Sequence, residues 1–354
     1  SIAHNPAHFR VARAWMHCYV ALCFVVLSLA LVVRAGSATK ELSVVESREE
    51  DLVGGTKTYA RRVFRIYALM TLVAGIAIVL TGVSPFEGLQ YALAAVSTGG
   101  FSPLDESLAP LVGSFTPLVV LLACVAGAVP LAFYYQVRRP GWRKTFGFLQ
   151  TVALAIFIGV AATVLSLWFA WRGNAPTWWH APLLIVSAQS TAGFSTVDPA
   201  NLDAASKLLL MIAMFTGGGA GATAGGIKLI RTLIIAKLLM MLLFRTSLTP
   251  HAVARKQLHG RTLDGGECEE AMLVVLLFLG VIVFSWSAFL LAGYDPIDSL
   301  FEVVSAVGTV GLSTGITGPD LPGVLKAVLC VDMLLGRLEI LAWLVLIYPR
   351  TWIG

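Results

Sequence analysis

Three short segments of the chain share a residue pattern that could bind a dehydrated cation. Each reads T-[GAV]-G-[FL]-S after one small residue. A glycine has no Cβ, so the backbone there can turn carbonyl oxygens toward a common axis. Converging carbonyl oxygens can replace the water shell of a monovalent cation. We therefore expect an ion-binding site at Ser97, Thr98, Gly99 and Gly100; Ser190, Thr191, Ala192 and Gly193; and Gly308, Thr309, Val310 and Gly311.

The spacing of the three loops indicates an internal repeat. Their last glycines are 93 and 118 residues apart, and each loop follows a short apolar segment and precedes a longer one. Repetition of one unit predicts pseudo-symmetric packing around a common axis. The short segments, if helical, would direct the negative ends of their dipoles at the same place, which favours a cation. The alternative is that these loops are ordinary turns between helices.

A second unusual stretch is FTGGGAGATAGGIKLIR, from Phe215 to Arg231. A nucleotide-binding loop needs a strand before it, and this stretch follows an apolar segment that reads as helix. Glycine costs about 1 kcal/mol relative to alanine at a helix position, so we expect a broken membrane helix here. A close-packed glycine patch between helices is the alternative. The residues assigned to this break, a candidate gate, are Gly217, Gly218, Gly219, Ala220, Gly221, Gly225, Gly226 and Lys228.

One arginine falls inside the last apolar segment. Arg337 is followed two residues later by Glu339, and Asp332 precedes it. Insertion of an arginine at the membrane centre costs about 2.5–3.5 kcal/mol, so such a residue faces a cavity or a partner. A structural pair with Glu339, with a carbonyl or with Asp332 is one interpretation. A fixed positive charge facing the pore is the other.

The remaining reactive residues predict no catalysis. The five cysteines and six histidines are dispersed without ligand spacing, and the cysteines read as small buried apolar residues. There is no nucleophile–base set, so we expect no enzyme. A membrane-embedded enzyme would have His180 as its only candidate near the membrane.

The elements that must position these residues are membrane helices. Apolar residues make up 57% of the 354 positions, charged residues 13%, and the mean hydropathy is +0.82. Soluble domains average about 45–50% apolar and about 25% charged, so the chain is an all-α polytopic membrane protein. A spanning helix takes roughly 20 apolar residues. Long helices are predicted at 13–34, 66–83, 110–136, 146–171, 207–244, 271–293 and 323–349, and short ones at 85–97, 178–191 and 297–308.

Charge orients these helices. The loops that follow the short helices carry acidic residues, whereas another set of loops is basic. By the positive-inside rule the basic loops are cytoplasmic. They explain the net charge of +5 without nucleic acid, although contact with a cytosolic partner or anionic lipid is an alternative role. The basic residues are Lys57, Arg61, Arg62, Arg65, Arg138, Arg139, Arg143, Lys144, Arg245, Arg255, Lys256 and Arg261; the acidic ones are Asp105, Glu106, Asp198, Asp203 and Asp320.

The three loops, the glycine-rich break and the C-terminal LLGRLEILAWLVLIYP together resemble the Trk/Ktr/HKT superfamily of potassium transporters. The last segment is most similar to the TrkH branch, and VGTVGLSTGIT is closer to KtrB. The resemblance implies pseudo-fourfold repeats of helix, pore helix, loop and helix around one ion pore. It assigns the filter glycines to Gly100, Gly193 and Gly311, and K⁺ as the bound and transported ion. Arg337 would lie below the filter and raise the barrier to cation flow.

The same resemblance implies the function and the partners. We expect uptake of potassium, a monovalent cation, across the cytoplasmic (inner) membrane through a carbonyl-lined filter with an intramembrane gating loop, without a cofactor in this chain. The implied partners are a second copy in a homodimer, a cytosolic nucleotide-binding regulatory subunit like TrkA or KtrA, and the lipid bilayer. The alternative is a secondary transporter of a small solute, which would need a roomy site at the middle of the membrane.

Three of the four expected repeats are visible. Residues 1–40 are interpreted as the last helix of a truncated first repeat, so its filter loop is expected to precede Ser1 unless the chain is a degenerate member. Residues 41–65 and 246–270 read as cytoplasmic linkers. The second, third and fourth repeats are predicted at 66–137, 138–245 and 271–354.

Overall fold

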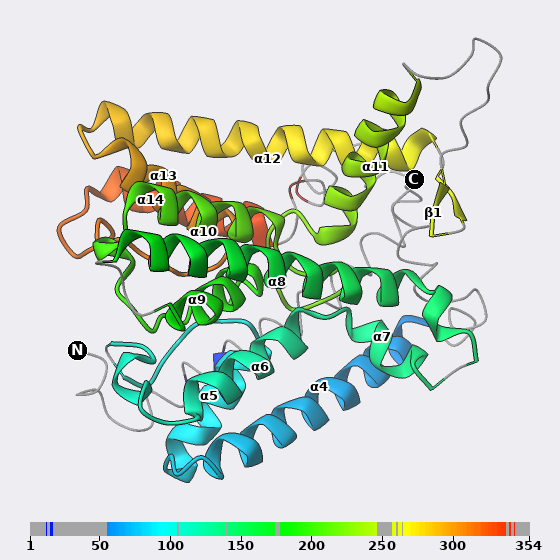
Figure 1. The fold of residues 1–354 in the computed structure, drawn as a ribbon, viewed down its shortest axis with the longest axis horizontal. Helices are drawn as coiled ribbons and strands as arrows, with labels where there is room; N and C mark the ends of the chain where they lie inside the picture. The colour runs from blue at the N-terminus through cyan, green and yellow to red at the C-terminus, as the bar shows by residue number, and fades with distance from the viewer. Residues whose placement is uncertain are drawn as a thin grey trace.

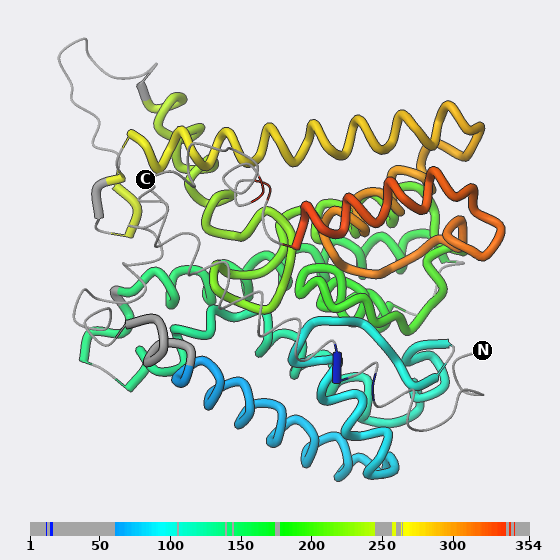
Figure 2. Tube along the Cα trace, turned by 180° about the vertical axis from the view of Figure 1, so that it is seen from behind, coloured from blue at the N-terminus to red at the C-terminus, as the bar shows by residue number. Residues whose placement is uncertain are grey.

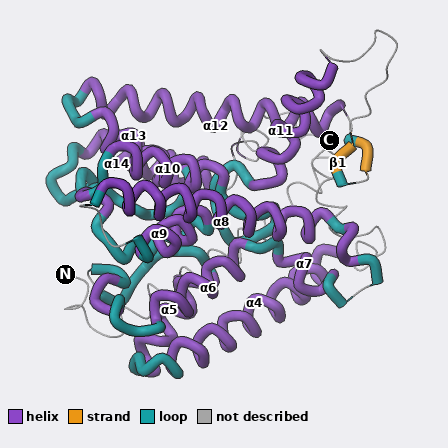
Figure 3. Tube along the Cα trace, viewed as in Figure 1, coloured by secondary structure: helices purple, strands orange, loops and turns teal. Residues whose placement is uncertain are grey.

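The structure, a computed structural model, is almost entirely helical. It describes residues 12, 15, 16, 55–104, 106–138, 140–173, 178–245, 257–259, 261–263, 265–337, 340 and 343. Within these residues the only strands are β1 (Gln257–Leu258) and β2 (Arg261–Thr262), a small antiparallel hairpin (Figure 3). The all-α prediction is therefore confirmed. The helix predicted at 13–34 lies almost wholly outside the described residues.

Three long helices carry the apolar surface. They are α4 (Gly55–Val79), α8 (Phe146–Arg172) and α12 (Gly265–Leu291), and in the described part of the chain they are the helices long and apolar enough to cross a membrane. Only 22–28% of the residues in their apolar windows are buried within the protein. In Figure 1, α12 and α4 run along opposite edges and α8 crosses between them. So much exposed apolar surface is what a lipid-facing helix requires.

Each long helix is followed by a short, mostly buried helix. These are α5 (Pro85–Val96), α9 (His180–Gln189) and α13 (Pro296–Val307). Two of them begin at side-chain caps, because Ser84 accepts a hydrogen bond from the Glu87 N–H and Asp295 accepts from the N–H groups of Ile297 and Asp298. Proline follows each cap at the first helical position, where its missing N–H has no cost.

The order of packing places the repeats side by side. Each short helix packs on the long helix before it and on the helix after it, which is α6 (Thr116–Ala128), α10 (Ala204–Thr216) or α14 (Gly323–Arg337). Across repeats, α6 packs on α9 and α10 packs on α13. The predicted second, third and fourth repeats therefore follow one another around the three T-x-G loops, which we call the filter loops after their predicted role. Figure 2, seen from behind, shows α14 in red above the cyan segment that follows α5.

One predicted helix was wrong. The segment at 110–136 is not continuous, because it divides into η1 (Ala109–Leu111), α6 and α7 (Leu131–Gln136). Val129 has an extended backbone, with ψ at 141°, and Pro130 follows it. Proline has no N–H and its ring clashes with the preceding turn, so the helix ends there.

The break predicted within 207–244 is present. Helix α10 ends at Thr216 and α11 (Leu229–Arg245) begins after the loop at 217–228, which we call the gate loop. Two further short 3₁₀ turns are η2 (Trp142–Lys144) and η3 (Pro199–Asn201).

Candidate ion-conduction site

The three T-x-G loops share one backbone conformation. Thr98, Thr191 and Thr309 have φ values of 50°, 53° and 52°, in the left-handed region that a β-branched residue rarely adopts. The glycines two residues further on, Gly100, Gly193 and Gly311, have φ values of 70°, 76° and 92°. A strained conformation that recurs three times is a feature held by the surrounding structure rather than a chance turn.

Hydrogen bonds at the end of each short helix explain how the threonine is held. In the second repeat, the N–H of Thr98 donates to the Ala95 carbonyl at 3.0 Å and the N–H of Gly99 donates to the Ala94 carbonyl at 2.8 Å. This pair of bonds is the Schellman motif that closes helix C-termini. The third and fourth repeats repeat it at 3.1 and 2.9 Å and at 3.0 and 2.8 Å. Each loop is therefore built as the cap of its own short helix.

Neighbouring loops touch through their glycines. A Cβ added at Gly100 would overlap the carbonyl oxygen of Ala192, and one at Gly193 would overlap the carbonyl oxygen of Val310. No side chain fits at either position, since the backbone also has positive φ. Around Gly311 the described residues leave the corresponding space open.

Two cavities meet at these loops. Gly100, Gly193 and Gly311 all line one cavity of 560 Å³, together with the carboxyl-bearing Glu106 and Asp198. The structure thus brings the three predicted filter glycines to one place. A second cavity, of 460 Å³, lies between the T-x-G loops of the second and fourth repeats. It is lined by residues of both loops, by Glu302 and by Arg337.

The charged residues of the last helix have separate surroundings. Arg337 ends α14 and lines the 460 Å³ cavity, so it lies on the same cavity as the filter loops. Asp332 is buried, and its Oδ1 accepts a hydrogen bond from the Ser285 hydroxyl of α12 at 2.7 Å. Glu339, the other suggested partner of Arg337, lies outside the described residues.

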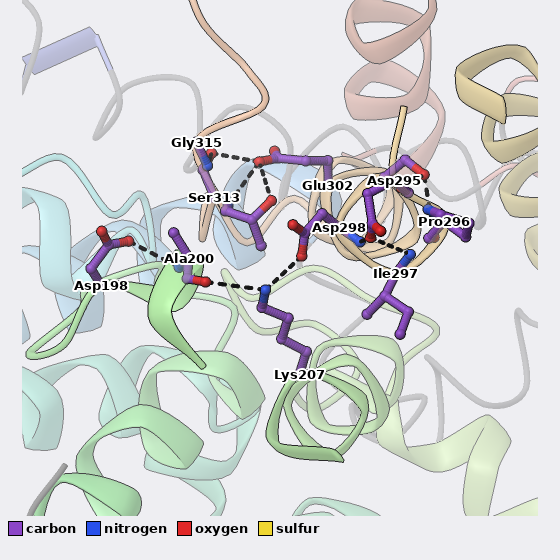
Figure 4. Close-up of polar contacts among 12 residues, drawn as sticks. Asp198, Ala200, Lys207, Asp295, Pro296, Ile297, Asp298, Glu302, Ser313 and Gly315 are labelled. Carbon is purple, nitrogen blue, oxygen red and sulfur yellow. Dashed lines mark hydrogen bonds and ion pairs between the residues drawn. The ribbon is translucent and has the colours of Figure 1, made fainter. Parts of the chain in front are cut away.

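Polar contacts join the third repeat to the fourth and hold the segment after the loop of the fourth repeat (Figure 4). The Nζ of Lys207, which is only 6% exposed, donates to Asp298 Oδ1 at 2.6 Å and to the Ala200 carbonyl at 3.3 Å. This joins α10 to α13. Glu302 of α13 accepts hydrogen bonds from the segment after the fourth loop: from the hydroxyls of Ser313, Thr314 and Thr317 and from the Thr314 N–H. The short helix α13 therefore holds both ends of its loop.

Asp203, at the start of α10, ties this helix to α8. Its carboxylate accepts from the Ser206 hydroxyl at 2.5 Å and from Trp168 Nε1 at 3.1 Å, and Arg172 lies 3.7 Å away. Partial burial alone would raise the pKa of Asp203, but the hydrogen bonds and the arginine charge outweigh it, so the pKa lies below its usual value.

The gate loop contacts the filter loops of the third and fourth repeats and the end of the short helix of the second. The N–H of Gly225 donates to Thr191 Oγ1 at 2.7 Å, and the Thr223 hydroxyl donates to the Val96 carbonyl, the last residue of α5, at 2.9 Å. A Cβ at Gly225 would overlap Thr309 Oγ1 and the Gly308 carbonyl. Residues 217–228 line neither cavity. The loop contacts the filter loops at their threonines and at the C-terminal ends of the short helices.

Backbone groups freed by the break in the helix find partners elsewhere. The N–H of Gly219 donates to the Ala128 carbonyl at 2.9 Å, and the N–H of Thr223 donates to the Gly127 carbonyl at 3.2 Å. Irregular backbone inside a membrane is tolerated where protein supplies such bonds. The predicted break and the alternative of a close-packed glycine patch therefore both describe this segment.

Lys228 closes the loop. It has φ of 73°, and its ammonium donates to the Ala224 carbonyl. Arg231, in the first turn of α11, donates to the Ile227 carbonyl at 3.2 Å and lies 4.0 Å from Glu270 of α12.

The sequence interpretation missed two buried glutamines that contact this loop. Gln189 Nε2 donates to the Gly217 carbonyl at 2.6 Å, and Gln150 Oε1 accepts from the Ala220 N–H at 2.6 Å. A glutamine inside an apolar segment was a usable signal, since a buried amide needs hydrogen-bond partners. Its partner could not be read from the sequence.

Repeated helix, short helix, loop and helix units define a class: a polytopic membrane protein assembled around re-entrant loops. The fold resembles the crystal structure of the potassium transporter TrkH from Vibrio parahaemolyticus, with a TM-score of 0.85 and 22% identity over 99% of this chain and 75% of that chain. Residues 173–351 match the family model described as TrkH, cation transport protein. The chain belongs to this family. A transport family agrees with the prediction that the chain is not an enzyme.

Relatives of known sequence extend the match over most of the chain. It is 28% identical over 322 residues to an uncharacterized cation transporter of Methanocaldococcus jannaschii, covering 91% of this chain and 66% of that protein. It is 30% identical over 312 residues to the Trk system potassium uptake protein TrkH of Halomonas elongata, covering 83% of this chain and 62% of that protein. The chain therefore spans slightly less than two thirds of the length of these relatives.

Proposed function

We propose that this chain carries the ion pathway of a potassium uptake protein of the inner membrane. The observation that carries the proposal is the convergence of Gly100, Gly193 and Gly311 on one cavity, from three loops of the same conformation. Relatives named as potassium uptake proteins support K⁺ as the transported ion.

The chemistry proposed for the loops is replacement of hydration water by backbone carbonyls. A short helix leads to each loop and turns its C-terminal, partly negative end toward it, which favours a cation over an anion. The Schellman bonds fix the loops in advance, so binding an ion requires little reorganisation. Glu106 and Asp198, on the cavity lining, raise the local concentration of cations.

The gate loop at 217–228 is the proposed barrier to flow. Its residues are small and can change backbone conformation without clashes, and they contact Thr191 and Val96. Arg337 adds a second barrier in this proposal, because a fixed positive charge beside the pathway repels a passing cation.

The proposed assembly is a homodimer controlled by a cytosolic nucleotide-binding subunit like TrkA or KtrA. Relatives named as components of a Trk system support a multi-subunit arrangement. The basic residues of the first half of α4, such as Arg65, and of η2, such as Arg143, lie on the predicted cytoplasmic side and form the proposed contact surface.

The test is cation flux into proteoliposomes that contain the full-length protein and its regulatory partner. K⁺, Rb⁺ and Na⁺ are compared, with Gly193→Ser as the filter variant. We expect cation-selective flux that Gly193→Ser alters, because a Cβ there overlaps the Val310 carbonyl. A folded protein that passes none of these ions would overturn the proposal and favour a transporter of a small solute.

A further inference from the structure

Two glutamines from different helices hold the first four residues of the gate loop. Gln189 is the last residue of α9, the short helix of the third repeat, and Gln150 lies in α8; both side chains are 1% exposed. Gln189 uses both ends of its amide where α10 stops: Nε2 donates to the Gly217 carbonyl at 2.6 Å, and Oε1 accepts from the Thr216 hydroxyl at 3.0 Å. Gln150 Oε1 accepts from the Ala220 N–H at 2.6 Å.

The backbone partners decide which end of each amide makes the bond. A backbone N–H can only donate, so the atom of Gln150 that faces Ala220 must be the oxygen. A carbonyl can only accept, so the atom of Gln189 that faces Gly217 must be the nitrogen. The two glutamines therefore contribute opposite chemistry, one an acceptor and the other a donor.

These bonds exist only in the conformation described. The carbonyl of Gly217 and the N–H of Ala220 lie beyond the regular helix, so each depends on a partner outside it. If the loop moves, these backbone groups and the glutamine amides lose their hydrogen bonds while still buried. Leaving buried donors and acceptors unpaired costs free energy. Each glutamine thus stabilises the closed loop relative to any displaced one.

We propose that Gln150 and Gln189 are positioning residues that form a two-point latch, which sets how much of the time the gate loop is closed. This inference rests on the proposed function, in which displacement of residues 217–228 permits cation flow. The latch acts through the loop backbone, and neither glutamine contacts the ion.

The first experiment replaces each glutamine with methionine, which keeps the length of the side chain and removes its polar atoms. Gln90→Met is the matched control: Gln90 is also a buried glutamine of a short helix, and its Nε2 has no hydrogen-bond partner among the described residues. Two readouts are taken from the full-length protein in lipid: cation flux, and hydrogen–deuterium exchange of the peptide covering residues 217–228.

We expect Gln150→Met and Gln189→Met each to raise the flux and the exchange rate by roughly five- to tenfold, the scale of one buried hydrogen bond, with no change in Gln90→Met. If the wild-type protein passes cations and both methionine variants keep its flux and exchange rate, the latch is overturned. If exchange accelerates as expected but no variant passes cations, the latch stands and the proposed function fails.

Glutamate substitutions test the chemistry of each end. Gln150→Glu keeps an acceptor oxygen for Ala220 in either protonation state, so exchange at the loop should stay near that of the wild type. Gln189→Glu, measured above the pKa of the new carboxyl group, has no donor for the Gly217 carbonyl, so exchange should then accelerate as in Gln189→Met. The reverse pattern, acceleration in Gln150→Glu alone, would overturn the proposed geometry.

Discussion

The helices α6 and α10, which follow the filter loops of the second and third repeats, begin alike and end differently. Both α6 and α10 have 13 residues. After α6 the chain bends at Val129 and Pro130 and resumes helix at once as α7, whereas after α10 it makes the long gate loop before α11. Proline ends the first helix by removing a donor, and a run of glycines ends the second by removing helix propensity. The same unit thus acquires a bend in one repeat and a candidate gate in the next.

The backbone groups freed at the two breaks form hydrogen bonds with each other. The last carbonyls of α6, on Gly127 and Ala128, accept from N–H groups of the gate loop, and the first N–H of α7, on Leu131, donates to the Gly221 carbonyl at 3.3 Å. Helix ends leave such groups without partners inside the helix. The bend in the second repeat therefore presents the polar backbone against which the loop of the third repeat closes.

The largest expected effect comes from filling the tightest point of the gate loop. Gly225→Val would drive a branched side chain into Thr309 Oγ1 and the Gly308 carbonyl. Overpacking of this kind costs the closed arrangement about 1–3 kcal/mol or more, so we expect a displaced gate loop, a rise in cation flux of up to about a hundredfold, and a lower melting temperature. Gly159→Ala, on α8 where no atom lies within 4 Å of an added Cβ, is the control: it should leave the flux unchanged and should not lower the melting temperature. Wild-type flux in Gly225→Val would mean that the loop does not pack as described.

The fourth repeat extends the comparison, because its helix α14 continues unbroken to Arg337. A unit charge about 8 Å from a cation is worth about 2 kcal/mol at an effective dielectric of 20. Arg337→Ala should therefore raise the flux, by about thirtyfold, when measured in proteoliposomes. Arg337→Lys keeps the charge and should stay near the wild type. An unchanged or lower flux in folded Arg337→Ala contradicts the assignment of this residue as a barrier.

A smaller effect is expected where the two breaks meet. The Thr223 hydroxyl donates to the carbonyls of Val96 and Gly127, at 2.9 and 3.0 Å. Thr223→Val keeps the shape and removes this donor, at about 1 kcal/mol, so flux should rise about fivefold. Thr163→Val, which removes a hydroxyl bonded within α8, should leave flux unchanged. Equal effects of the two variants would place the coupling elsewhere.

The smallest effect should come from Pro130→Ala. The new N–H would seek the Ala126 carbonyl, which already accepts from the Tyr134 hydroxyl at 2.7 Å, and the carbonyls of Gly127 and Ala128 stay bound to the gate loop. We therefore expect flux within about twofold of the wild type and a bend that persists in the structure of the variant. A straightened helix with altered gating would show that Pro130 alone sets the bend.

Local features of this fold could be predicted, and long-range ones could not. The T-x-G loops were visible because a helix cap and a positive-φ glycine depend on adjacent residues. The bend at Pro130 was equally local but was hidden inside a run that is long enough to span a membrane. The latch was beyond reach, since Gln150 and Ala220 are 70 residues apart and meet only through packing of α8 against the loop. Likewise, the sequence suggested that the three glycines converge but not which carbonyl each one touches.

The contacts among the filter loops have a sense of rotation. Gly100 lies against the carbonyl of Ala192, and Gly193 lies against that of Val310, so every contact runs from one repeat to the next along the chain. Each of these two glycines therefore packs on a carbonyl of the following repeat, and neither contact runs in the opposite direction. Added bulk at Gly193 first meets the Val310 carbonyl of the fourth repeat, whereas added bulk at Gly311 meets no described atom within 4 Å, so the three loops, although alike in shape, are not mechanically interchangeable.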